Sequence, residues 1–364
     1  MTELGELLPH QPDFATVDLP PAGGSLGPEP EDFVVDEISA YSPSGAGDHW
    51  WVRVKKRLYA TPDLVRAVAR AADVPERDLG YAGMKDQHAV TTQWLSVPAR
   101  GRPPDGWVLP AGIELLEVTR HTNKLRTGHL SGNRFSLRLV GLDADGFERA
   151  RVIADRLLEA GLPNYFGTQR FGRDGQNLAR AVDWLGRGAP PMGKRTRLLR
   201  KLYPSVVQAE IFNRYLTARR ALGMSAVRAG EVVRLDRSRA LFVVEDAVRE
   251  QPRLRAREIH LTGPIWGPKM KIPAGELREL ELSVAAELGW DDRLEAGLFA
   301  LVDGTRRDLV VWPENLRLER LDEHRLAMEF VLPAGSYATE LVGEFTRRPL
   351  DGPEGRARAG TPRP

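Results

Sequence analysis

Residues 325–332, with the sequence RLAMEFVL, contain the clearest strand pattern of the chain. Every second side chain is large and apolar, so Leu326, Met328, Phe330 and Leu332 share one face of an extended chain. A period of two residues is typical of a strand with one buried face. Because this strand follows a long segment of mainly helical pattern, it indicates a chain that returns to a sheet near its end.

The first part of the chain has strand patterns of the same kind, at 33–38, 50–54, 94–97 and 135–139. Thr61-Pro62-Asp63 indicates the start of a helix, with Thr61 as the capping hydroxyl and Pro62 at the first helical position. A second helix, over 145–160, is predicted to end at Gly161-Leu162-Pro163. Residues 1–30 are rich in proline and glycine and are expected to be a loose lead-in.

The middle of the chain is different, because helical patterns dominate there. They are predicted at 176–185, 205–222 and 276–288, with a short strand at 240–245 between them. Strands return at 308–312 and 325–332, and a last helix is expected at 338–345. We therefore predict the α+β class: a mixed, mainly antiparallel sheet with flanking helices, interrupted by a more helical α/β insertion domain. The predicted parts are 1–160, the insertion at 161–308, the returning segment at 309–346, and a disordered tail at 347–364.

Composition excludes several classes of function. The 364 residues include no cysteine, which rules out disulfides, thiolate metal sites and a cysteine nucleophile, and fits a reducing cytosol. No apolar run approaches the roughly 18 residues of a membrane span, and the first residues do not resemble a signal peptide. The seven histidines lack helical metal-ligand spacing, so no metal is expected. With 52 basic and 50 acidic residues, any nucleic acid must be held by local patches.

The segment Gly80–Trp94 is the most unusual part of the sequence. It places glycines, an aromatic residue, the pair Lys85-Asp86, His88 and two threonines between a helix and a strand. Loops held by a scaffold often contain functional residues. Taken alone, however, an aspartate after a lysine in a turn is more often a cap or a solvated ion, and a single loop histidine is usually a bystander.

Two basic segments contain no acidic residue and suggest contacts with nucleic acid phosphates. The first, 121–140, includes Lys124, Arg126 and Arg134. The second, 186–203, includes Lys194, Arg195, Arg197 and Arg200. Either segment alone is more simply read as a solvated surface, but together they favour RNA or DNA binding. The run PNYFGTQRFG at 163–172 adds aromatics and amides that could stack on bases and contact their edges, or pack a tight corner.

Five motifs, in order along the chain, resemble the tRNA pseudouridine synthase D family. The motif G-x-K-D-x-x-A-x-T-x-Q runs from Gly83 to Gln93. The others are PEDF at 30–33, GNRF at 132–135, PNYFGTQRFG at 163–172 and LPAGSYAT at 332–339. They span nearly the whole chain. The resemblance implies the pseudouridine synthase sheet, split by a domain particular to the family, and the isomerisation of uridine at position 13 in the D arm of tRNA.

Carried over by motif, the resemblance implies that Asp86 is the nucleophile. It implies that Phe33, Asn133 and Tyr337 contact the target uridine, that Phe135 stacks on it, and that Lys85 belongs to the same binding site. Relatives often have phenylalanine at the position of Tyr337. They also commonly have a lysine where this chain has Gly27, so a basic partner for Asp86 is unassigned, with Lys85 and Arg134 as candidates.

The implied chemistry suits these residue types. A carboxylate can attack and leave again, which divides one hard step into easier ones, and aspartate is ordinarily ionised at neutral pH. The base must leave its stack to be reached and then be held by stacking and edge contacts. No cofactor, metal or nucleotide is needed, and tRNA is the expected partner. Two alternatives stay open: a tRNA-binding protein or RNA chaperone that has lost the chemistry, and an unrelated hydrolase that uses Asp86 and His88.

Overall fold

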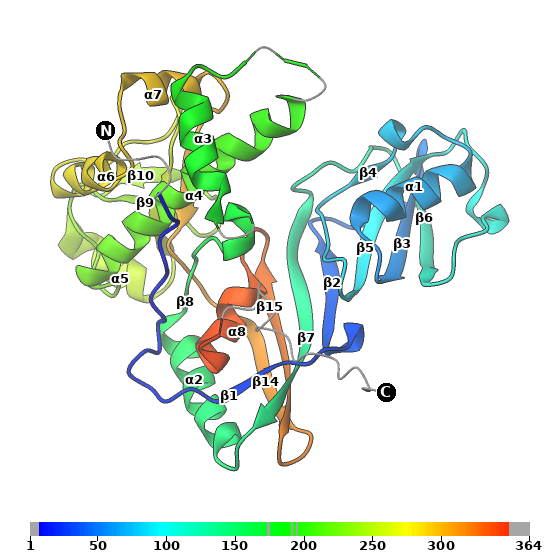
Figure 1. The fold of residues 1–364 in the computed structure, drawn as a ribbon, viewed down its shortest axis with the longest axis horizontal. Coiled ribbons are helices and arrows are strands. Elements are labelled where there is room, and N and C mark those ends of the chain that lie inside the picture. The colour runs from blue at the N-terminus through cyan, green and yellow to red at the C-terminus, as the bar shows by residue number, and fades with distance from the viewer. Residues whose placement is uncertain (1–6, 173–174, 191, 194–195, 349–364) are drawn as a thin grey trace. The chain divides into compact units, whose positions relative to one another are not determined.

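The computed structural model describes residues 7–172, 175–190, 192–193 and 196–348, and most of the predicted tail lies outside these residues. The described chain divides into two compact units. The first, which we call the sheet unit, consists of residues 18–160 and 312–348. The second, the insertion unit, consists of residues 7–17 and 161–311. Each unit is described by itself below (Figure 1).

The sheet unit is built on a nine-stranded sheet with the order β14-β15-β7-β2-β5-β3-β6, while β1 pairs with β7 and β4 with β5. The pairing of β2 with β5 is parallel, and the other pairs are antiparallel. In chain order the strands are β1 (Gly23–Leu26), β2 (Phe33–Ser39), β3 (His49–Arg57), β4 (Gly80–Tyr81), β5 (Val90–Pro98), β6 (Ile113–His121), β7 (Leu130–Leu142), β14 (Glu314–Arg320) and β15 (Arg325–Pro333).

The predicted return of the chain to the sheet is confirmed by β15, which pairs with β7 over nine residues from Arg325↔Val140 to Pro333↔Gly132. Figure 1 shows the orange β15 beside the green-cyan β7, although about 180 residues of chain separate them. The lead-in was predicted to be loose, yet it contains β1, which pairs with the far end of β7. Its short GGSL sequence lacks the alternation that marks the longer strands.

Three helices belong to the sheet unit: α1 (Thr61–Ala72), α2 (Gly146–Ala160) and α8 (Ala338–Thr346). Helix α1 buries Leu64, Val65 and Val68 against β3 and β5. The prediction that Thr61 caps this helix is wrong, because the N-cap is Ala60 and no side chain caps it. The hydroxyl of Thr61 is instead buried and bonded to the segment that follows β4.

The insertion unit is more helical, as predicted. Its helices are α3 (Asn177–Gly186), α4 (Thr196–Ala221), α5 (Ala247–Arg255), α6 (Glu276–Ala286) and α7 (Asp292–Phe299). A four-stranded sheet has the order β10-β9-β11-β12, formed by β10 (Leu241–Val243), β9 (Val232–Leu235), β11 (Ile259–Ile265) and β12 (Thr305–Asp308). Helix α4 begins well before the predicted residue 205, since it continues through Pro204.

The predicted strand at 308–312 is divided in the structure. Asp308 ends β12, and β13 (Val310–Val311) pairs with β8 (Leu162–Pro163) instead of joining the large sheet. The two short strands lie at the two ends of the 161–311 segment, so they bring those ends together.

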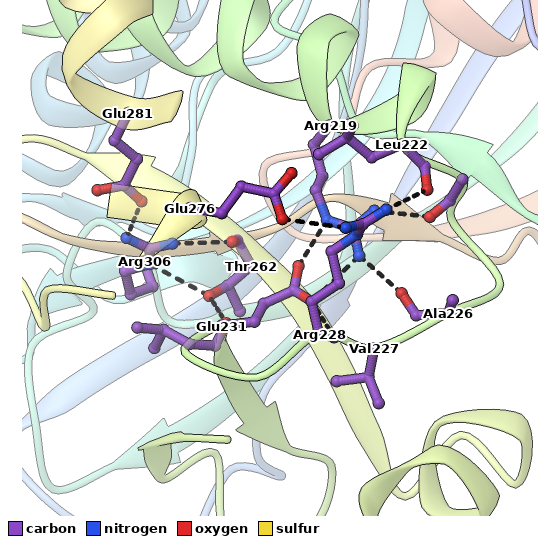
Figure 2. A network of polar contacts seen from close by, with 12 residues as sticks. Arg219, Leu222, Ala226, Val227, Arg228, Glu231, Thr262, Glu276, Glu281 and Arg306 are labelled. Carbon is purple, nitrogen blue, oxygen red and sulfur yellow. Dashed lines mark hydrogen bonds and ion pairs between the residues drawn. The ribbon is translucent and has the colours of Figure 1, made fainter. Parts of the chain in front are cut away.

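Buried ion pairs connect the helices and strands of the insertion unit. Arg219 on α4 bonds Glu231 at 2.8 Å, and Arg306 on β12 bonds Glu281 on α6 at 2.5 Å, with all four side chains fully buried. Arg306 also donates a hydrogen bond to the carbonyl oxygen of Thr262 at 2.9 Å (Figure 2). Each buried guanidinium therefore has a carboxylate in direct contact, as buried charges normally require.

Candidate active site

One row of residues crosses five strands of the sheet unit. Lys56 on β3 lies opposite Thr91 on β5, Thr91 beside Val35 on β2, Val35 opposite Phe135 on β7, and Phe135 opposite Phe330 on β15. Residues paired directly across strands project from the same face of a sheet. At about 4.8 Å per strand, the row from Lys56 to Phe135 spans roughly 14 Å.

The next row along the strands places Glu37 opposite Asn133, and Asn133 opposite Leu332. Because side chains alternate along a strand, Glu37 projects from the same face as Val35, and Asn133 from the same face as Phe135. The face therefore combines an aromatic region with buried polar groups. Glu37 and Lys56 are both buried there.

The aromatic region contains two of the predicted uridine-contacting residues. The rings of Phe33 and Phe135 meet edge to face with centroids 6.3 Å apart. Phe330 stacks on Phe135 with centroids 5.2 Å apart, and only 6% of Phe135 is exposed. Since Phe330 covers one side of the ring, a base could stack only on what remains of Phe135. The stacking role stays a prediction.

Asn133 has an unused acceptor. Its Oδ1 atom is buried, and no hydrogen-bond donor reaches it from the described part of the chain. A buried polar atom without a partner is costly unless a ligand satisfies it. Tyr337, the third predicted contact, is the N-cap residue of α8, four residues after the end of β15.

The loop between β4 and β5, which contains Asp86, is fixed above this face at Lys85. The Lys85 ammonium bonds Glu37 Oε2 at 2.5 Å, and the two side chains are 5% and 1% exposed. The backbone N–H of Lys85 donates to Thr61 Oγ1 at 2.9 Å, and that hydroxyl donates to Gln93 Oε1. A lysine held in this way anchors the loop. Its predicted contact with substrate stays a prediction.

Lys56 holds the same loop one residue further on. Its Nζ atom donates to the carbonyl oxygen of Asp86 at 2.8 Å and to that of Tyr59 at 2.5 Å. Burial lowers the pKa of Lys56 to about 8, although the nearby Asp86 carboxylate opposes this shift and Lys85 adds to it. Asp86 itself is half-buried.

Glu37 and Lys56 were not among the predicted site residues, although the sequence contains a signal for both. Phe33, Val35 and Glu37 alternate inward on β2, and Val52, Val54 and Lys56 do so on β3. A charged residue that continues an inward-facing apolar series is a candidate buried functional group. Both series begin with apolar residues and end in a charged one, so their apolar members alone do not indicate a functional site.

The position of Gly27 has a local explanation. A Cβ atom at residue 27 would collide with the Asp32 carboxylate, whose Oδ2 accepts the backbone N–H of Glu29 at 3.1 Å. Arg138 approaches the same carboxylate at 3.6 Å. The space next to Gly27 is therefore occupied by Asp32, and the arrangement leaves no room for a lysine side chain at residue 27.

The two candidates for a basic partner of Asp86 are each near another carboxylate. Lys85 bonds Glu37, and Arg134 lies 4.0 Å from Asp36.

The basic patches belong to different units. In the sheet unit, Lys124 donates to the carbonyl of Arg77 at 2.7 Å and lines a cavity of about 570 Å³ together with Arg100 and Arg120. Asp48 and Asp78 also line that cavity, so its charge is mixed. Arg126 is exposed. In the insertion unit, Arg197 and Arg200 lie in the first turns of α4, while Lys194 and Arg195 fall outside the described residues.

Two classes of feature are absent from the described residues. No cluster of three or more histidine, aspartate or glutamate side chains there could hold a metal ion. None of the helices in those ranges is long and apolar enough to cross a bilayer. His88, which the hydrolase alternative requires, is exposed on the loop that contains Asp86.

Comparison with known proteins decides the family. A family model described as tRNA pseudouridine synthase D (TruD) matches residues 13–182 and 193–345. The chain belongs to the tRNA pseudouridine synthase D family. The resemblance inferred from the five motifs is thereby confirmed.

Relatives within the family match over nearly their whole length. A tRNA pseudouridine synthase D of Anaeromyxobacter dehalogenans is 45% identical over 350 residues, which cover 94% of this chain and 98% of the relative. One of Thermus thermophilus is 37% identical over 343 residues, with 93% of each chain covered.

A solved structure confirms the predicted fold class. It is a putative tRNA pseudouridine synthase D of Methanosarcina mazei, which superposes with a TM-score of 0.70 at 23% identity. The superposition covers 93% of this chain and 97% of that one. The protein thus has the α+β fold of the family, with its mainly antiparallel sheet and its helical insertion.

Proposed function

We propose that this chain isomerises uridine to pseudouridine at position 13 in the D arm of tRNA, with Asp86 as the nucleophile. The broader activity, that of an isomerase forming pseudouridine in tRNA, follows from membership of the family. The position in the tRNA and the role of each residue are the proposal.

One observation supports the site most strongly. The loop containing Asp86 is fixed by Lys85 and Lys56 over the sheet face that contains Asn133 and Phe135. Asn133 offers a buried acceptor suited to an N–H group of uracil, and Phe135 offers a ring. A base extruded from its stack requires such edge and stacking partners.

The reaction balances without any redox change. The N1–C1′ and C5–H bonds break, and the C5–C1′ and N1–H bonds form, so the product has the same atoms as the substrate. Asp86 would attack and later leave, which divides the exchange into two easier steps. We propose that Phe33 and Tyr337 complete the pocket and that Lys124, Arg126, Arg134, Arg197 and Arg200 contact phosphates. Those phosphate contacts would supply affinity without sequence preference.

Release of tritium from tRNA labelled at C5 of uridine tests the activity directly, because the C5 hydrogen leaves during isomerisation. Pseudouridine mapping in tRNA from a strain lacking this gene tests the position. We expect uridine at position 13 to stay unmodified in that strain and the modification to return on complementation. Binding without tritium release would support the RNA-chaperone alternative, and a product other than pseudouridine would support a hydrolase.

A further inference from the structure

Lys56 differs from the other buried cations of this protein. Arg219 and Arg306 are fully buried, and each has a carboxylate oxygen within 2.8 Å (Figure 2). Lys56 is also 0% exposed, yet within the described chain its ammonium donates to two backbone carbonyls, those of Tyr59 and Asp86, and pairs with no carboxylate. A buried ammonium without a carboxylate in contact costs folding free energy, so its retention needs another reason.

The contacts of Lys56 point to that reason. The two carbonyls belong to separate loops, one after β3 and one before β5, and the second belongs to the proposed nucleophile. A hydrogen bond to the Asp86 carbonyl fixes the backbone from which the carboxylate projects. The ammonium charge also acts on that carboxylate, because the two groups interact electrostatically. Lys56 thus restrains the backbone of Asp86 and interacts electrostatically with its carboxylate.

We propose that Lys56 is a positioning residue for Asp86, and this inference rests on the proposed function of Asp86. Lys56 holds the Asp86 backbone in register with the sheet, and its ammonium charge interacts with the carboxylate that is to attack. It does so from beneath the loop and has no exposed surface of its own. Lys85, the residue before Asp86, is fixed by its own ion pair with Glu37. Two consecutive residues of the loop are therefore held in place, Lys85 by Glu37 and Asp86 by Lys56.

The test compares two adjacent lysines. Lys56→Met keeps the length of the side chain and removes the charge and both hydrogen bonds. Lys55→Met is the matched control, because Lys55 is the neighbouring residue on β3, is exposed, and its ammonium lies 3.9 Å from the carboxylate of Glu114. Single-turnover rates with full-length tRNA, tRNA dissociation constants and melting temperatures are measured for both variants and for the wild type.

We expect Lys56→Met to lower the single-turnover rate about a hundredfold, the loss typical of misplacing a reacting group by an ångström. The dissociation constant for tRNA should stay within about threefold, because phosphate contacts dominate affinity. Lys55→Met should match the wild type in both. A Lys56→Met variant that is folded and as fast as the wild type would overturn the inference. Full activity in Asp86→Asn would instead overturn the proposed function, whatever Lys56→Met does.

The pH dependence provides a second readout. The charged groups facing Lys56 are the Asp86 carboxylate and the Lys85 ammonium, while its strand neighbours Thr91 and Ile113 are uncharged. Because the pKa of Lys56 is about 8, the ammonium loses its proton and its charge above that pH. The wild-type single-turnover rate should therefore fall as pH rises above about 8.

Lys56→Arg keeps its charge and should move this fall to higher pH, even if its maximal rate is lower. This variant also decides the matter if Lys56→Met does not fold. A fall at the same pH in Lys56→Arg as in the wild type would contradict the inference.

Discussion

The ammonium of Lys85 lies 2.5 Å from Oε2 of Glu37, in a pair that solvent barely reaches. The other oxygen of Glu37 accepts the backbone N–H of Trp94 on β5 at 3.1 Å. Glu37 therefore ties the loop before β5 to strand β2 and to β5 itself. Its carboxylate thus connects the loop of Asp86 to two strands of the sheet.

We predict that Glu37→Gln lowers the stability of the folded protein and has a smaller effect on the free energy of tRNA binding. The amide can still accept the Trp94 N–H, but it leaves the Lys85 ammonium buried without a counter-charge, which typically costs about 3–5 kcal/mol. Thermal unfolding should show a lower melting temperature. The double variant Glu37→Gln/Lys85→Met also removes the unpaired Lys85 ammonium and should recover part of the lost melting temperature. No recovery in the double variant would show that the pair contributes nothing through its charge.

Asp86→Asn is expected to abolish tritium release while tRNA affinity survives within about tenfold. The amide is almost the same shape as the carboxylate but is a far poorer nucleophile, and the phosphate contacts that dominate affinity are unchanged. Filter binding and tritium release measured on the same preparation check both parts. Substantial turnover by this variant would remove Asp86 from the mechanism.

The contribution of Phe135 should combine stacking with packing. Phe135→Tyr keeps the ring and should keep considerable activity. Phe135→Ala should lose about 1–3 kcal/mol of base stacking, or roughly ten- to a hundredfold in rate. It should also lower the melting temperature, because the ring packs on Phe33 and Phe330. A purely thermal effect, with an unchanged rate for the folded fraction, would end the stacking role.

Asn133→Ala should cost at least as much rate as Phe135→Ala. A uracil edge group bound in this pocket would be left buried without its partner. Because Asn133 Oδ1 has no hydrogen-bond partner within the described ranges, its removal should leave the melting temperature nearly unchanged. The single-turnover rate and the melting temperature of the same sample separate these effects. A large thermal loss would argue for a structural role.

The basic segment before and within α4 should contribute salt-dependent affinity. Replacing Arg195, Arg197 and Arg200 together should weaken tRNA binding. It should also flatten the salt dependence, because each lost phosphate contact removes about 0.7–0.9 from the log–log slope. Replacement of Arg151, Arg317 and Arg66, three arginines outside both basic segments, is the control. If the slope of the first variant were unchanged, the segment would be an ordinary solvated surface that makes no phosphate contacts.

Local patterns in the sequence predicted much of the fold. The alternation in β15 and β7, the apolar face of α1 and the ends of α2 are all properties of a few neighbouring residues, and each is confirmed. The strand β1 was missed because its glycine-rich sequence has no pattern of its own and is extended only through pairing with β7. Tertiary context determines such strands.

The site was only partly predictable for the same reason. The motif around Asp86 could be read directly, but its anchors Glu37 and Lys56 lie on other strands and meet the loop only after the sheet has formed. Thr61 illustrates the limit. Its place beside Pro62 predicts a helix cap, yet its hydroxyl is used by Lys85 and Gln93. The sequence alone does not show whether the Thr61 hydroxyl bonds to its own helix or to residues distant in the chain.

The pairing of β8 with β13 has a consequence for how the chain tolerates change. Val310 lies opposite Pro163, and Val311 opposite Leu162, so the segment of about 150 residues begins and ends at adjacent points. For the large sheet, this segment is topologically equivalent to a hairpin loop of a few residues. The entropy of closing a loop grows only slowly with its length. The segment can therefore lengthen, shorten or be exchanged among descendants of one ancestor while the register of β15 against β7 is preserved.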